Sequence, residues 1–254
     1  MVTITKELLE KEAVVHNDVE EYAELFDLDP DLVRALITQE SRFIGEAVSP
    51  TRAFGFGQFT SIGAKQVQLI AAMTPKAADL ANFQKSEASD PDRGIKGVCA
   101  FLWWLIYRKY GQITDKKLQL EMALTFYNAG GRPAAIVLKH GSHAAAVPEL
   151  KALPKETRSQ SDKYAAEVSV WYVAWHEYTK QKKAEKVAAE EVSSTTTITP
   201  VSNPFDSEEK GIDPRLRALV EALRWMGEKD AAVECSVSSR DGFTEVVLIL
   251  PGEF

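Results

Sequence analysis

The chain has 254 residues, 45% hydrophobic and 26% charged, which is enough for one full hydrophobic core and a small second module. Its formal net charge of −7 argues against a nucleic-acid partner, because phosphate binding needs a basic surface. The longest apolar run, residues 98–107, covers only about half of the ~20 residues that a membrane-spanning helix requires, so we expect no membrane span.

Residues 1–22 lack the basic start and apolar core of a signal peptide. The two cysteines, Cys99 and Cys235, lie far apart in apolar stretches, which predicts buried, reduced thiols rather than a disulfide framework. His140 and His143 lie three residues apart around a Gly-Ser loop, too few ligands for a metal site. We therefore expect no cofactor and no metal.

Residues 1–180 are predicted to form one all-α domain. Asp29, Pro30 and Asp31 form a helix start signal, followed by apolar residues at helical spacing. The run 97–111 is apolar nearly all round, which predicts a buried central helix closed by a glycine. Residues 118–131 predict another apolar helix ending in a glycine pair, and residues 163–180 predict a helix with an aromatic face. No strand is predicted before about residue 230.

Residues 181–211 begin as a charged helical tail and continue in Ser, Thr, Pro and Asn, which is typical of a linker. Residues 212–254 predict a small α+β docking module. A helix starts at Asp213 and stops at Gly227, and two strands, 231–238 and 243–250, form a hairpin. About forty residues bury little core of their own. We expect this module to dock on the first domain, on a second copy or on another protein.

Glu40 is the candidate catalytic residue, at the end of the apolar segment 35–43. Taken alone, a glutamate near a helix end is usually a solvated surface charge. Three later segments with glycine or proline breaks add polar groups between apolar helices, a pattern that builds a groove for a polar polymer. These segments contribute Ser49, Gln58, Tyr127, Asn128 and Glu156.

The four segments ESRF, SP followed by GFGQ, YNAG and LPKET followed by a tyrosine resemble the soluble lytic transglycosylase (SLT) domain family in order and spacing. The likeness covers about residues 18–178. It implies a mainly α, lysozyme-like fold related to goose-type lysozyme, and a peptidoglycan glycan strand as the substrate. It also implies that Glu40 is catalytic. The residues that match substrate-contacting positions are Ser41, Ser49, Gln58, Tyr127, Asn128 and Glu156.

The sequence departs from the family pattern at three places. Gly57 stands where a methionine is common, Phe126 replaces a small residue, and Gly131-Arg132 replaces the usual Pro-Gly or Gly-Pro. These changes concern the shape of the sugar subsites rather than the reaction.

Glycoside cleavage normally needs two carboxylates, and the motif segments offer one well-placed candidate. The resemblance implies that the acetamido group of N-acetylmuramic acid assists Glu40 and that a 1,6-anhydro end forms without water. We expect Tyr127 to orient Glu40 or this acetamido group, and Ser41 to hydrogen-bond Glu40. A hydrolytic muramidase of the same fold is the nearest alternative, with Glu46 or Asp90 as its water-activating carboxylate. A non-catalytic wall-binding or virion structural protein, and a chitin-type glycosidase, also stay open.

The resemblance places the activity in the bacterial periplasm or cell wall. Without a recognisable signal peptide, a bacteriophage virion or a dedicated secretion machine is the expected carrier. Residues 212–254 are then the part that binds a virion or secretion-machine protein, for local opening of the wall.

Overall fold

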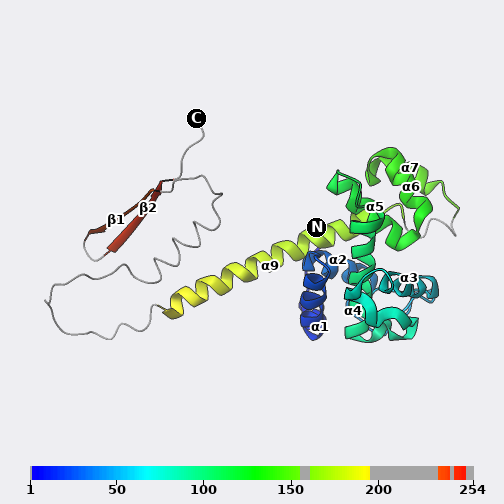
Figure 1. Ribbon diagram of the computed structural model, residues 1–254, viewed down its shortest axis with the longest axis horizontal. Helices are drawn as coiled ribbons and strands as arrows, with labels where there is room; N and C mark the ends of the chain where they lie inside the picture. The colour runs from blue at the N-terminus through cyan, green and yellow to red at the C-terminus, as the bar shows by residue number, and fades with distance from the viewer. Residues whose placement is uncertain (1, 155–160, 195–233, 241–242, 250–254) are drawn as a thin grey trace. The chain divides into compact units, whose positions relative to one another are not determined.

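The computed structural model describes residues 2–154, 161–194, 234–240 and 243–249, with backbone only for 188–194 and for the last two ranges. The chain divides into two compact units, Met1–Thr196 and Thr197–Phe254. In the described residues of the first unit, helices are the regular elements, and isolated bridges occur in one loop (Figure 1). This confirms the mainly α, lysozyme-like fold that the sequence predicts.

The helical unit contains α-helices linked by short 3₁₀ segments and one π-helical segment. In chain order they are α1 (Lys6–Leu25), α2 (Pro30–Glu40), α3 (Ser61–Ala71), η1 (Pro75–Asn82), η2 (Lys85–Ser89), α4 (Pro91–Trp103), the π-helical η3 (Trp104–Lys109), α5 (Lys116–Ala129), α6 (Gly131–His140), α7 (His143–Lys151) and α9 (Tyr164–Ser194).

Side-chain caps explain where most of these helices begin. An oxygen of the N-cap residue accepts a hydrogen bond from a backbone N–H in the first turn, which satisfies a donor that otherwise has no partner. Proline at the first helical position follows the cap of α2 and of α4, where its missing N–H costs nothing. The capping residues are Thr5, Asp29, Thr60, Asp90, Asp115 and Ser142.

Helix α4 is the buried central helix that the sequence predicts. Ile95, Val98, Cys99 and Leu102 are fully buried in one continuous core with residues of α1, α2 and α5. The prediction missed one feature of this helix. From Trp104 the backbone continues as the π-helical η3 before it ends at Lys109.

Helix α9 packs along α2 and α5 (Figure 1). Tyr164, Val168 and Trp175 of its predicted face are buried, whereas Trp171 and Tyr172 are half-buried. Trp175 is fully buried and its indole N–H donates to the Thr38 hydroxyl of α2 at 2.9 Å. The helix continues to Ser194, so the start of the segment expected as a linker, 181–194, is helical. The side chains of residues 180–187 are exposed.

The second unit contains an antiparallel hairpin of β1 (Glu234–Arg240) and β2 (Phe243–Ile249). It overlaps the predicted strands, and β1 continues two residues past the predicted end at 238. Glu234 pairs with Ile249 and Arg240 with Phe243. The helix predicted from Asp213 to Gly227 lies outside the described residues, and the boundary of a docking module at residue 212 stays a prediction.

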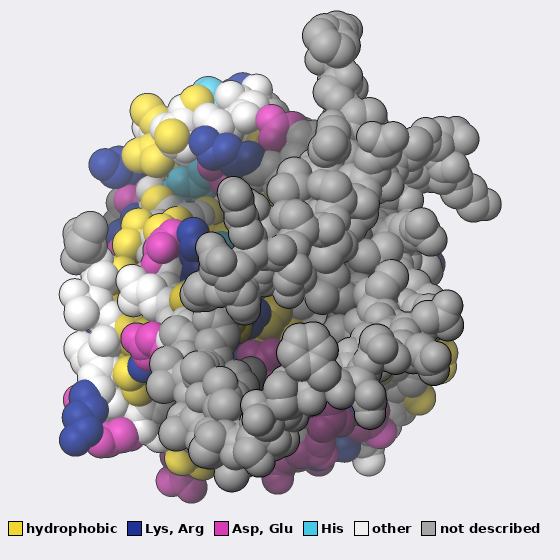
Figure 2. Space-filling model, turned by 90° about the vertical axis from the view of Figure 1, so that its left-hand side faces the viewer, with side chains coloured by type: hydrophobic (Ala, Val, Ile, Leu, Met, Phe, Trp, Pro, Cys, Tyr) yellow, Lys and Arg dark blue, Asp and Glu magenta, His cyan; other side chains and the backbone are white. Residues whose placement is uncertain are grey.

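Basic and acidic side chains are interspersed among the described residues on the face shown in Figure 2. Within the described ranges, no helix has the length and apolar character needed to cross a bilayer.

A buried ion cluster joins α1 to α2. The Arg34 guanidinium is almost fully buried and donates to Glu12 at 2.7 Å, to Asp31 at 3.1 Å and to Glu20 at 2.5 Å. Glu12 and Asp31 are themselves buried. Desolvating these charges is costly, so the cluster is stable only while every member keeps its partners.

Replacing Arg34 by methionine should lower the free energy of unfolding by about 3–5 kcal/mol, because two buried carboxylates lose their counter-charge. Urea denaturation followed by circular dichroism measures this change. Lys6→Met is the matched control, since Lys6 pairs with Glu10 on the exposed surface of α1 and its loss should change stability little. Equal stability of the two variants would contradict the assignment.

Candidate active site

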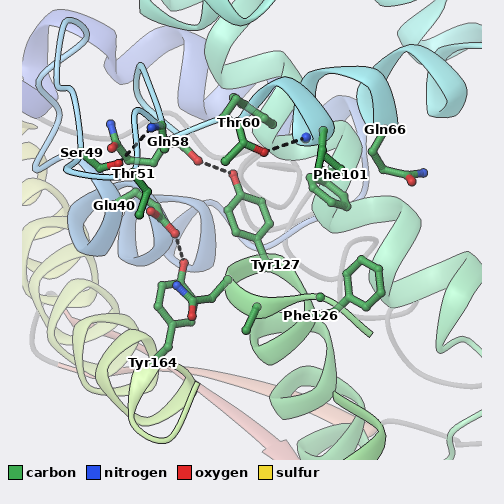
Figure 3. Close-up of a pocket in the computed structure, with 18 of the residues that line it drawn as sticks. Glu40, Ser49, Thr51, Gln58, Thr60, Gln66, Phe101, Phe126, Tyr127 and Tyr164 are labelled. Carbon is green, nitrogen blue, oxygen red and sulfur yellow. Dashed lines mark hydrogen bonds between the residues drawn. The ribbon is translucent and has the colours of Figure 1, made fainter. Parts of the chain in front are cut away.

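A cavity of about 750 Å³ lies where the end of α2, the loop before α3, the end of α5 and the start of α9 meet (Figure 3). This volume is within the usual range of ligand sites. Five of the predicted site residues line it: Glu40, Ser49, Gln58, Tyr127 and Asn128. The fold therefore brings together residues that lie up to about ninety positions apart in the sequence.

Glu40 is the last residue of α2, and the chain turns sharply behind it. Arg42 and Phe43 both have positive φ, at 52° and 59°, a conformation that side-chain-bearing residues adopt at a cost. The Phe43 ring is buried against Trp175 of α9, with centroids 5.9 Å apart. This packing holds the turn in place, so the Glu40 side chain is directed into the cavity.

The Glu40 carboxyl has a pKa raised to about 7, because burial disfavours its charged form. The Tyr164 hydroxyl, at the start of α9, donates a hydrogen bond to Glu40 Oε1 and lowers the pKa in part (Figure 3). Burial, with the Glu40 charge, raises the pKa of Tyr164 well above its ordinary value, so the phenol keeps its proton and remains a donor. Glu40 can hold a proton near neutral pH, as a general acid must.

Tyr127 lies beside Glu40, but its hydroxyl forms a hydrogen bond with a different group. Its hydroxyl donates to the backbone oxygen of Gly57 at 2.9 Å. A Cβ at Gly57 would lie 2.6 Å from this hydroxyl and 2.4 Å from Val98 Cγ2, so only glycine leaves room for the tyrosine. The glycine that departs from the family pattern is thus coupled to the position of Tyr127. Of the two roles expected of Tyr127, the hydrogen bond to Glu40 is made by Tyr164, and the contact with an acetamido group stays a prediction.

Gln58 and Ser49 line the cavity and also hold its loop together. The Gln58 amide nitrogen donates to the backbone oxygens of Ala47 and Gly55, each at 2.9 Å. The Ser49 hydroxyl accepts from the Ala53 backbone N–H at 2.9 Å. These bonds leave the loop pre-formed, with polar atoms facing the cavity.

Asn128 follows Tyr127 at the end of α5, where Gly130 ends the helix with φ of 80°. Its side-chain oxygen is buried and has no hydrogen-bond partner among the described residues. An unpaired buried acceptor is costly, so this oxygen is available to a ligand N–H or O–H.

Among the described residues, the remaining predicted site residue, Ser41, does not line the cavity. The Ser41 hydroxyl is buried and donates to the backbone oxygen of Ile37 at 3.3 Å instead of to Glu40. Glu156 lies outside the described residues. Glu46 is exposed and Asp90 caps α4, and neither lines the cavity. Of the described lining residues, Glu40 alone carries a carboxyl group.

Sequence reasoning missed Tyr164 as a site residue. It placed Tyr164 on the apolar face of a helix, and the side chain is indeed buried at 2% exposure, but its hydroxyl reaches Glu40. The sequence signal for this role was the tyrosine that follows the LPKET segment in the family pattern. In the described part of the chain, no group of three or more His, Cys, Asp or Glu side chains could hold a metal ion.

A family model described as the transglycosylase SLT domain matches residues 18–145, half of the chain. The match includes Glu40 and the four other predicted residues at the cavity, and it ends before Tyr164. No curated protein matches the chain.

Replacing Glu40 by glutamine should stabilise the protein at neutral and alkaline pH. The folded pKa of about 7 exceeds the ordinary 4.5, so the favourable contribution of Glu40 is full below pH 4.5 and is lost as the pH rises to about 7. The variant should therefore gain stability over wild type across this window, by about 1–3 kcal/mol at pH 8, a figure reduced because Glu40 is partly exposed. Urea denaturation at pH 4.5, 6 and 8 measures the difference. A difference that does not change with pH would show that the carboxyl is not buried.

Proposed function

This chain belongs to the transglycosylase SLT domain family, which acts on peptidoglycan, and on that premise we propose its reaction and its catalytic residue. The reaction is non-hydrolytic cleavage of the bond between N-acetylmuramic acid and N-acetylglucosamine. Glu40 is the single acid and base. The observation that carries the proposal is the Glu40 carboxyl, whose pKa desolvation raises to about 7, in a cavity lined by polar groups.

In the first step, protonated Glu40 gives its proton to the glycosidic oxygen as the bond to the muramic acid C1 breaks. The neighbouring 2-acetamido oxygen stabilises the positive charge that develops at C1. Tyr164 supports this step, because its hydrogen bond to Glu40 Oε1 fixes the carboxyl and stabilises the carboxylate that remains.

In the second step, the Glu40 carboxylate takes the proton of the sugar's own C6 hydroxyl, whose oxygen bonds to C1. The products are a 1,6-anhydromuramoyl end and a free N-acetylglucosamine end, and Glu40 is protonated again. No water is consumed. Glu40 is the sole carboxylate among the described lining residues, which favours this route over hydrolysis with a second, water-activating carboxylate.

The remaining polar residues at the cavity are proposed to hold the sugars. The unpartnered oxygen of Asn128 suits an acetamido N–H or a sugar hydroxyl. Ser49 and Gln58 offer polar atoms from a loop that their own hydrogen bonds hold rigid. Tyr127, held by Gly57, separates the catalytic end of the cavity from its aromatic end.

Mass spectrometry of muropeptides released from purified sacculi tests the proposal. Wild type should release products with anhydromuramoyl ends, and Glu40→Gln should release them at roughly 10²–10⁴-fold lower rate, because the proton donor is gone. The control variant must not add a carboxyl group to the cavity wall, as Gln39→Glu would. Glu46→Gln removes an exposed carboxylate and should leave the rate unchanged.

Reducing ends in place of anhydro ends would identify a hydrolase and overturn the proposed route. Equal loss of activity in Glu46→Gln would identify a second carboxylate. Release of no products by wild type would indicate a non-catalytic wall-binding protein.

A further inference from the structure

The π-helical segment η3 places two residues together that an α-helix would separate. A π-helix pairs residues five positions apart, whereas five residues of α-helix turn the side chain about 140° away. As a result the Lys109 ammonium lies over the Trp104 ring, 5.1 Å from its centroid. Such π segments are rare and frequently occur at functional sites.

Three aromatic rings surround the Lys109 ammonium. Its nitrogen lies 4.7 Å from the Phe126 centroid, 5.1 Å from Trp104 and 5.8 Å from Tyr110. Of the residues that the structure describes, no Asp or Glu forms an ion pair with it. The ring faces hold the cation, but they do not accept its N–H donors as a carboxylate would. The aromatic rings therefore hold the Lys109 ammonium in place, and no carboxylate of the described residues pairs with it.

Phe126 connects this cation to the cavity. It lines the cavity together with Phe101, whose ring centroid is 6.5 Å away, and it also contacts Lys109. Figure 3 shows Phe101 and Phe126 on the side of Tyr127 away from Glu40. A strand that leaves Glu40 past Tyr127 thus reaches the Phe126 ring, and the Lys109 ammonium lies 4.7 Å from the centroid of that ring, outside the cavity lining.

We infer that Phe126, Trp104 and Lys109 form a subsite for a free carboxylate of the peptide attached to the glycan strand. This inference rests on the proposed function and names a part of the substrate that it left open. The stem peptides of peptidoglycan are linked through the lactyl group of muramic acid and carry free carboxylates and alanine methyl groups. The methyl groups pack on Phe126, and the carboxylate accepts charge-assisted hydrogen bonds from Lys109.

The location of the subsite also suits the electrostatics of Glu40. A peptide carboxylate close to Glu40 would add a negative charge beside it and raise the pKa of Glu40 further, which would oppose its return to a carboxylate. A cation beyond Phe126, outside the residues that line the cavity, draws the anionic peptide away from the reacting bond.

A comparison of two substrates distinguishes a loss of peptide binding from a loss of the reaction itself. One substrate is sacculi that carry stem peptides, and the other is the same glycan strands after an amidase has removed the peptides. Lys109→Met keeps the apolar stem that covers the rings and removes the charge. Its kcat/KM should fall roughly tenfold on peptide-bearing strands and change less than about twofold on peptide-free strands. Lys109→Arg should restore most of the loss. Lys117→Met, on the exposed start of α5, is the matched control and should behave as wild type on both substrates.

Equal loss on both substrates would overturn the inference, because it would mean that Lys109 supports only the packing of Phe126. No loss on either substrate would also overturn it. Absence of any product from wild type on both substrates would instead count against the proposed function. Should Lys109→Met fold poorly, Lys109→Gln and the Arg variant compared on the two substrates give the same test.

Discussion

The enclosure of the Glu40 carboxyl at the end of α2 is the constraint on which the rest of the site depends. Burial raises its pKa to about 7, and a carboxyl that holds its proton near neutral pH can act as a general acid. The same burial makes the charged form costly, so the protein must support it at the moment when it forms. Tyr164 does so with one hydrogen bond, because its own raised pKa keeps it a donor.

That hydrogen bond joins two helices, and further contacts fix their relative position. Trp175 of α9 donates to Thr38 of α2 at 2.9 Å, and Gln39 donates to Glu167 at 2.8 Å, one turn after Tyr164. One turn before Thr38, Arg34 is held by carboxylates of α1 and lies 5.9 Å from the Trp175 ring. The helix that carries Glu40 is therefore held by both α9 and α1. The family match begins at residue 18, so part of this support comes from residues before it.

Much of the fold could be predicted from the sequence because local signals govern it. Capping residues and prolines mark the starts of α2 and α4, and apolar periodicity marks their buried faces. Five residues at the cavity, Glu40 among them, could be predicted as site residues because four motifs occur together in one order.

Other features depend on tertiary contacts that no local pattern specifies. A buried tyrosine on an apolar helix face is usually core, and only the fold shows that the Tyr164 hydroxyl reaches Glu40. The π-helical register of η3 lies within a run that is apolar all round, so periodicity does not distinguish it from α-helix. Ser41 illustrates the reverse case: it is adjacent to Glu40 in sequence, but its hydroxyl bonds to the preceding helical turn.

The central claim is that Glu40 acts as an acid whose pKa is set by burial and by Tyr164. The most direct test is the pH dependence of kcat/KM for wild type and Tyr164→Phe on the same glycan substrate. Activity of wild type should fall on the alkaline side with a midpoint near pH 7, as Glu40 loses its proton. The midpoint of the variant should move to higher pH, because the hydrogen bond that lowers the pKa of Glu40 is gone. A wild-type profile without an alkaline decline, or identical midpoints for the two proteins, would contradict the account.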